Sequence, residues 1–317
     1  MHRAFIKTVA IPILFLALSG ALSARETTHD KSMYTINPKA KISGPILQEN
    51  GREKFNSEIF KIIIKEAHQR AAKYLESKNP HAYWSFLTLA LTVPFHESDI
   101  NHFREVDNKK GLCIETANNG VRVQKRAGAR GLRVFKKYFK AAPVSFVPNC
   151  GELSRDDTLT QLIHGPDAAD VGIMQVNLVW NEKPFAAPGH YKGVQSTIAF
   201  GQDMLMEAYD ELFRNKKKYW CLTMGKSKQF SYDYLIRGTW AGRYNGGHVS
   251  GSCRFANSKS PYAGNDKHFK LYFDKILNYQ NSGVYKMGER EMAAFAEIIE
   301  NHRNGTNKTE KIKPYIE

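Results

Sequence analysis

The sequence predicts a mainly α-helical fold, and three observations lead to this class. Apolar residues recur at helical spacing in several long stretches of the 317-residue chain, with polar residues on the opposite faces. Residues 82–96 are apolar almost all round, as in a helix buried in the middle of a domain. No stretch alternates apolar with polar residues as a half-buried strand does. The length fits one domain with additions.

The chain begins with the pattern of a secretory signal peptide. Arg3 and Lys7 precede an apolar run at 9–18 that ends in small residues. This run is shorter than the roughly 20 residues that cross a bilayer, which favours cleavage near residue 23 over a retained membrane anchor. We therefore expect residues 1–23 to be a signal peptide. The protein is then periplasmic or secreted and meets the membrane only transiently, during export.

A polar lead-in and a first amphipathic helix are expected next. Residues 24–50 have no apolar period and are predicted to be flexible. Apolar residues then recur at helical spacing from Phe55 to Tyr74, and Asn79 followed by Pro80 should end this helix.

The apolar helix at 82–96 leads to the first candidate for a functional residue. Pro94 should bend or end this helix just before His96 and Glu97. A carboxylate at the broken end of a buried helix is unusual, because ionising it there costs free energy unless something compensates. The alternative is a glutamate in an ordinary ion pair at the protein surface.

Four later stretches also show helical periodicity, namely 194–214, 230–243, 266–280 and 288–302. We expect residues 51–285 to form one domain. Residues 286–317 are expected to add a C-terminal helix and a polar tail.

The four cysteines predict disulfides. They are Cys113, Cys150, Cys221 and Cys253, an even number in a chain expected to be exported, and they allow three pairings. Sequence order favours Cys113 with Cys150 and Cys221 with Cys253. None of them lies within metal-ligand spacing of another, so disulfides are favoured over a zinc site in an oxidising compartment.

The chain is strongly basic, with a formal charge of +15 that becomes +13 when Arg3 and Lys7 leave with the signal peptide. Such a protein is attracted to polyanions. Only the charge would support a nucleic-acid binder, because the sequence contains no recognisable nucleic-acid-reading module. Export favours an anionic polymer of the cell envelope.

Three short motifs follow one another along the chain. They are His96-Glu97-Ser98, then Gly-Ile-Met-Gln-Val-Asn at 172–177, then Tyr-Asn-Gly-Gly at 244–247. In this order they resemble the soluble lytic transglycosylase and goose-type lysozyme superfamily, with its Glu-Ser, Gly-Leu-Met-Gln and Ala-Tyr-Asn-Ala-Gly motifs. The likeness covers about residues 82–100 and 168–280. It implies a lysozyme-like (SLT-type) helical domain with a substrate groove.

The resemblance also implies roles for individual residues. Glu97 corresponds to the catalytic glutamate, and the Tyr244 hydroxyl is expected to hold its carboxyl group. The residues expected to bind substrate are Ser98, Met174, Gln175, Tyr244 and Asn245. Trp240, one helical turn before Tyr244, is the best candidate among the tryptophans for stacking on a sugar ring.

The implied reaction is cleavage of the β-1,4 bond between N-acetylmuramic acid and N-acetylglucosamine in peptidoglycan. A buried carboxyl with a raised pKa can protonate the leaving oxygen near neutral pH. Attack by the muramic C6 hydroxyl would then give a 1,6-anhydro sugar. Hydrolysis usually recruits a second carboxylate, for which Asp99 and Asp170 are candidates. The alternatives are a hydrolytic goose-type lysozyme, acting on a normal or modified wall, and a non-catalytic envelope glycan-binding protein.

No metal or cofactor is expected. His96 and His102 flank Glu97, but their spacing is not the i, i+4 pair that places two imidazoles on one helical face. The expected partner is peptidoglycan.

This chain differs from the superfamily pattern by a long insertion between the first and second motifs. Relatives place the second motif a short loop after the first, whereas here an insertion at about 101–167 intervenes. Residues 109–140 carry ten basic side chains against Glu115 alone. This stretch is either a solvated helix face or a basic flap that grips anionic groups of the wall.

Overall fold

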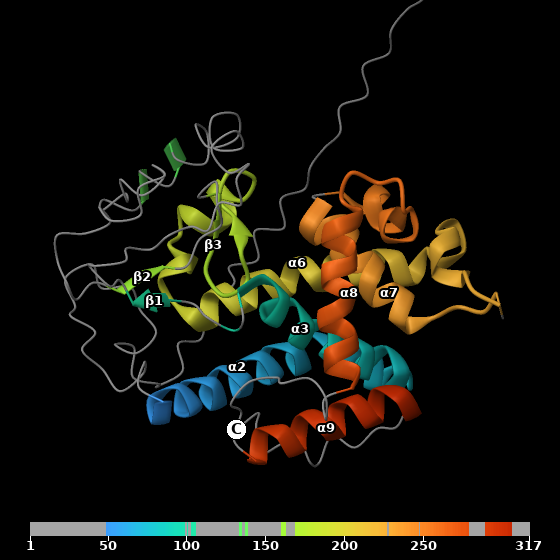
Figure 1. Ribbon diagram of the computed structural model, residues 1–317, viewed down its shortest axis with the longest axis horizontal. Helices are drawn as coiled ribbons and strands as arrows, with labels where there is room; N and C mark the ends of the chain where they lie inside the picture. Colours follow the sequence, from blue (N-terminus) through green and yellow to red (C-terminus); the bar gives the residue numbers. More distant parts are fainter. Residues whose placement is uncertain are drawn as a thin grey trace, which may run out of the picture.

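A computed structural model describes the folded core of the chain. The described residues are 49–98, 100, 103–105, 133–134, 137–138, 160–162, 169–226, 228–246, 248–278 and 289–305. The expected signal peptide, most of the lead-in and insertion, and the tail after residue 305 lie outside them. These residues are mainly helical, so the predicted mainly α class is confirmed (Figure 1).

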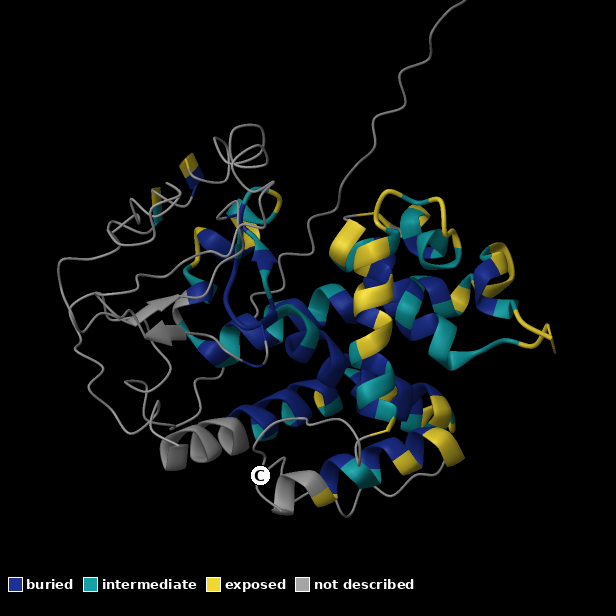
Figure 2. Ribbon diagram, viewed as in Figure 1, coloured by how far each residue is buried: buried dark blue, intermediate teal, exposed yellow. Residues whose placement is uncertain are grey.

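The centre of the fold is α3 (Pro80–Ser98). It packs against α2 (Glu49–Glu76), α6 (Val194–Arg214), α7 (Tyr232–Thr239), α8 (Ala263–Leu277) and α9 (Glu289–Asn304). Every residue of α3 from Ala82 to Phe95 is buried, as its apolar sequence predicted (Figure 2). Burial on all sides explains why α3 has no amphipathic face.

Pro94 was predicted to bend or end α3 just before His96 and Glu97, and the helix does not end there, because it continues to Ser98. The Pro94 carbonyl accepts hydrogen bonds from the Ser98 hydroxyl at 3.0 Å and from the Ile100 backbone N–H at 3.1 Å. Packing on every side of α3 and these closing bonds outweigh the local cost of proline. Glu97 therefore lies on the last turn of an intact helix.

The later helices follow their predicted positions closely. The bounds of α6 match the predicted 194–214. The stretch predicted as one helix at 230–243 divides into α7 and the π-helical turn Trp240–Tyr244. The C-terminal helix α9 belongs to the same core, because its buried Phe295 contacts Phe60 of α2 and Phe95 of α3.

Two small antiparallel sheets were not predicted. β1 (Phe103–Glu105) pairs with β2 (Thr160–Leu162), with Phe103 opposite Leu162. This pairing brings together the two ends of the predicted insertion. β3 (Asp170–Val171) pairs with β4 (Val176–Asn177) and closes the turn that contains the second motif.

One predicted disulfide lies within the described residues. Cys221 and Cys253 are bonded at 2.13 Å, with their Cα atoms 5.4 Å apart. The bond links the short 3₁₀ helices Trp220–Thr223 and Val249–Ala256. Cys113 and Cys150 lie outside the described residues. None of the helices in the described ranges is long and apolar enough to cross a membrane.

Candidate active site

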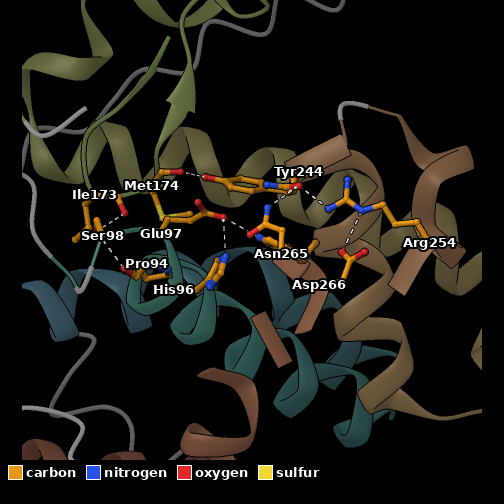
Figure 3. A network of polar contacts seen from close by, with 12 residues as sticks. Pro94, His96, Glu97, Ser98, Ile173, Met174, Tyr244, Arg254, Asn265 and Asp266 are labelled. Carbon is orange, nitrogen blue, oxygen red and sulfur yellow. Dashed lines mark hydrogen bonds and ion pairs between the residues drawn. The ribbon is translucent and has the colours of Figure 1, made fainter. Parts of the chain in front are cut away.

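The site is centred on Glu97, on the last turn of α3 (Figure 3). Its side chain keeps only 15% of its surface exposed. The indole N–H of Trp240 donates a hydrogen bond to Oε1 of Glu97 at 2.7 Å. Nε2 of His96 lies 4.0 Å from the same oxygen. The carboxyl group is therefore held in one orientation by the π-helical turn that follows α7.

The environment of Glu97 favours its protonated form. Burial raises the pKa of this carboxyl to about 8, and the negative charge of Asp170 acts in the same direction. The hydrogen bond from Trp240 and the positive charge of Arg254 lower the pKa, but they do not offset burial. The group can therefore carry a proton at neutral pH, as a general acid must.

The three sequence motifs meet at this carboxyl. The Ser98 hydroxyl donates to the backbone carbonyl of Ile173 at 2.8 Å, which joins the first motif to the second. The Tyr244 hydroxyl donates to the carbonyl of Met174, which joins the third motif to the second (Figure 3). Trp240, one helical turn before the third motif, connects that segment to Glu97 of the first motif.

The Ser98 and Tyr244 hydroxyls make hydrogen bonds that differ from the predicted contacts. Both donate to backbone carbonyls of the second motif, and Ser98 is 8% exposed. Tyr244 was expected to hold the carboxyl of Glu97, but it is the indole of Trp240 that donates to it. Ser98 was expected to bind substrate, but its side chain joins α3 to the turn of the second motif.

The second motif forms a tight turn between β3 and β4. Gly172 and Gln175 adopt positive φ values of 72° and 45°. The Gln175 side-chain amide donates to the Gly172 carbonyl at 2.8 Å, which stabilises the turn from within. This turn presents the carbonyls of Ile173 and Met174 to the other two motifs.

The Met174 side chain was predicted to line the substrate groove, but it is fully buried. It packs against Gly201 of α6, where an added Cβ would lie 2.7 to 2.9 Å from three Met174 side-chain atoms. The small residue at 201 therefore allows the turn to approach α6 closely. Met174 positions the turn from inside the core.

The prediction that Trp240 stacks on a sugar was also wrong. The indole is fully buried and lies parallel to the Phe269 ring, with centroids 4.2 Å apart. The Arg254 guanidinium lies 5.5 Å from its ring centroid. Neither ring face is open, so Trp240 acts on Glu97 through its N–H. Among the other tryptophans, Trp180 is 75% exposed.

Sequence reasoning missed a polar network beside Glu97, centred on Arg254. The Arg254 Nε donates to the buried Asp266 at 3.0 Å, and Nη2 donates to the side-chain carbonyl of Asn245. The Asn265 amide donates to the same Asn245 oxygen at 3.2 Å (Figure 3). Asn245 was predicted to bind substrate, and its exposed side chain is fixed by this network. No motif marks position 254; the preceding Cys253 was the available signal that this segment folds back onto the domain.

His96 belongs to the packed wall of the site. Its ring contacts the rings of Trp240, His268, Phe269 and Tyr272. Burial, followed by the nearby His268, lowers the pKa of His96 to about 3, so the imidazole is neutral at physiological pH.

His102 lies outside the described residues. Within the described residues, no group of three potential metal-ligating His, Cys, Asp or Glu side chains comes together.

Of the two predicted second carboxylates, Asp170 is described and Asp99 is not. Asp170 lies on β3, where the Asn177 amide donates to its Oδ1 at 2.8 Å. Its charge contributes to the raised pKa of Glu97, so the two carboxyls interact electrostatically.

Comparisons with protein-family models, curated proteins and solved structures found no match to this chain.

Proposed function

We propose that this protein is an exported enzyme that cleaves the glycan strand of peptidoglycan between N-acetylmuramic acid and N-acetylglucosamine, with Glu97 as general acid and base. One observation carries the proposal. Motifs that begin more than seventy residues apart come together beside a carboxyl whose pKa is raised to about 8. Perturbed carboxyls of this kind concentrate at functional sites. An ordinary surface glutamate would be neither enclosed nor fixed by an indole N–H.

The proposed reaction needs one carboxyl used twice. Glu97 gives its proton to the glycosidic oxygen as the bond from that oxygen to C1 of the muramic residue breaks. The muramic C6 hydroxyl then attacks C1, and its proton passes to the Glu97 carboxylate. The products are a 1,6-anhydro end and a free glucosamine hydroxyl, no water is consumed, and Glu97 is restored.

Asp170 supports a second candidate, hydrolysis. A hydrolase usually needs a second carboxylate to act on water or on C1. Asp170 interacts with Glu97 and is held by Asn177. The two reactions give products that differ by one water molecule, so mass spectrometry of fragments released from purified sacculi separates them. Asp170→Asn should cost little in the anhydro reaction but should be nearly as damaging as loss of Glu97 in hydrolysis.

The proposal is tested by Glu97→Gln, which keeps the side-chain volume but removes the transferable proton. Clearing of purified sacculi should fall by a factor of about 10² to 10⁴, with the upper end expected because one residue serves both steps. Sedimentation with sacculi should show that glycan binding survives. Glu76→Gln is the matched control, because Glu76 is exposed at the end of α2.

Two results would contradict the proposal. A folded Glu97→Gln protein that clears sacculi at a substantial fraction of the wild-type rate would remove Glu97 from the mechanism. Wild-type protein that binds sacculi but releases no fragments would favour a non-catalytic glycan-binding protein.

A further inference from the structure

A strongly basic surface lies between α6 and α7. From residue 212 to residue 230 the chain contains no Asp or Glu. It contains six basic residues, all exposed, namely Arg214, Lys216, Lys217, Lys218, Lys226 and Lys228. We call them, together with Trp220, the basic loop.

Trp220 is 61% exposed in the middle of the basic loop. Its exposure is imposed by the backbone, because the next residues, Cys221 and Leu222, are fully buried. Cys221 is bonded to Cys253, and the Leu222 carbonyl accepts a hydrogen bond from the Ser231 backbone N–H at 2.9 Å. The loop is thus anchored to the domain directly behind the indole, which projects outward.

Most of the positive charge in the basic loop is not neutralised locally. Within the described part of the chain, no ion pair joins Lys217, Lys218, Lys226 or Lys228 to a carboxylate. Lys216 lies over the rings of Phe213 and Phe230, 4.8 and 5.0 Å from their centroids. The neighbouring carboxylate of Asp210 forms an ion pair with Lys73 of α2. The basic loop therefore carries exposed ammonium groups before and after Trp220 in the sequence.

The basic loop is remote from Glu97. Gly201, which packs on the turn of the second motif, precedes Arg214 by thirteen residues of α6. At 1.5 Å per helical residue, this places Arg214, where the basic loop begins, about 20 Å further along α6 than Gly201. Figure 1 shows the segment after α6 at the far right, beyond α7, and Figure 2 shows that it is exposed. The basic loop is thus a surface separate from the catalytic site.

We propose that the basic loop binds the surface of an anionic phospholipid bilayer, with Trp220 in the interfacial region and the lysines on the lipid head groups. Indole rings favour the membrane interface, where an apolar body and a polar N–H are both satisfied. Clustered lysines are attracted to anionic head groups. A soluble polyphosphate would account for the lysines but gives no advantage to a single projecting indole. This inference does not depend on glycan cleavage, and it replaces the expectation that the protein meets the membrane only during export.

The test is partition of the full-length protein onto vesicles, measured by sedimentation. Wild-type protein should bind vesicles that contain phosphatidylglycerol, bind phosphatidylcholine vesicles far more weakly, and be released by salt. Each lysine near an anionic surface contributes roughly a fivefold factor, so Lys217→Gln with Lys218→Gln and Lys226→Gln should weaken partition about 100-fold. Lys78→Gln with Lys259→Gln and Lys267→Gln is the control, because these lysines are also exposed but scattered.

Trp220→Ala distinguishes a bilayer from other polyanions. It should weaken vesicle binding while leaving binding to soluble inorganic polyphosphate unchanged. In a Trp180→Phe background, where Trp84 and Trp240 are buried, vesicles should shift the indole emission of Trp220 to shorter wavelength. The proposal is overturned if Trp220→Ala has no effect on vesicle binding, or if the scattered triple variant weakens binding as much as the clustered one. Failure of wild-type protein to bind anionic vesicles would also overturn it.

Discussion

A carboxyl group that donates a proton near neutral pH needs surroundings that disfavour its anion. At Glu97 the end of a buried helix supplies those surroundings, and the raised pKa follows from burial first. The indole N–H of Trp240 limits the rise, because it stabilises the carboxylate that forms after proton transfer. In the proposed reaction, the same contact orients the acid and stabilises the carboxylate base that it becomes.

This environment costs stability, and the cost should be measurable. The folded-state pKa of Glu97 is about 8, whereas its ordinary value is 4.5, so folding favours the protonated form. As pH rises above 4.5, the unfolded chain loses this proton while the folded protein retains it. The free energy of unfolding should therefore fall between pH 4.5 and 8, and Gln at this position removes that fall.

Glu97→Gln should accordingly be more stable than wild type at neutral pH, by at most about 3 kcal/mol at pH 7. The difference should grow from pH 4.5 to 8 and then level off. Urea unfolding of both proteins across this range measures it, with Glu76→Gln as the flat control. Parallel stability curves for Glu97→Gln and wild type would show that the carboxyl is ionised in the folded protein at neutral pH.

The motifs pointed to the buried carboxyl of Glu97 but not to the residues that hold it. Glu97 could be selected from the sequence because three motifs and an apolar helix converge on it. The hydrogen bond from Trp240 to Glu97 could not be predicted, because the direction of the indole N–H depends on the π-helical turn that extends α7. Arg254 carried no local signal, since its role arises from contacts with Asn245 and Asp266 in other segments.

At the scale of elements, the turn of the second motif is positioned by its contact with α6. Gly201 lies in the interior of α6, where glycine normally weakens a helix by roughly 0.5 to 1 kcal/mol relative to alanine. The Met174 side chain fills the space that a Cβ would occupy. The close approach of the turn to α6, which this glycine allows, offsets the loss of helix stability.

Gly201→Ala should therefore destabilise the protein, by about 1 to 3 kcal/mol, because overpacking outweighs the improved helix propensity. Activity should fall as well, since displacement of Met174 moves the carbonyl that holds Tyr244. Gly264→Ala in α8 is the matched control, because no neighbouring atom lies within 4 Å of its added Cβ. Chemical unfolding midpoints that rise equally in both variants would show that the turn adapts without cost.

Periodicity predicted the long elements well and the short ones poorly. The bounds of α6 could be predicted because its apolar stripe persists over 21 residues. β3 and β4 have two residues each, too few to show an alternating pattern. α3 continues past Pro94, where local propensity alone would end it, because neighbouring helices pack around it.

At the scale of the whole molecule, segments distant in sequence depend on one another through α3. Its C-terminal end carries Glu97, and Phe95 beside it packs on Phe295 of α9. The third motif reaches the same end of α3 from α7 and its π-helical extension. The disulfide between Cys221 and Cys253 encloses this whole segment. We therefore expect the geometry at Glu97 to depend on this bond.

Removal of that disulfide should lower stability and activity together. The bond spans 32 residues, and the loss of unfolded-state entropy that it imposes corresponds to roughly 3 to 4 kcal/mol. Cys221→Ala with Cys253→Ala removes the bond without placing a hydroxyl at the fully buried position 221. The variant should unfold at lower temperature, and its activity against sacculi should disappear over the same lower range.

Reductant provides the control for this last prediction. Wild-type protein treated with a thiol reductant should approach the unfolding midpoint of the double variant. Any further decrease when the double variant itself is reduced would report on Cys113 and Cys150. An unchanged midpoint in the double variant, with full activity, would show that packing of α7 and its extension against α3 holds Trp240 and Tyr244 in place without the crosslink. The enclosed segment would then be fixed by its buried residues alone.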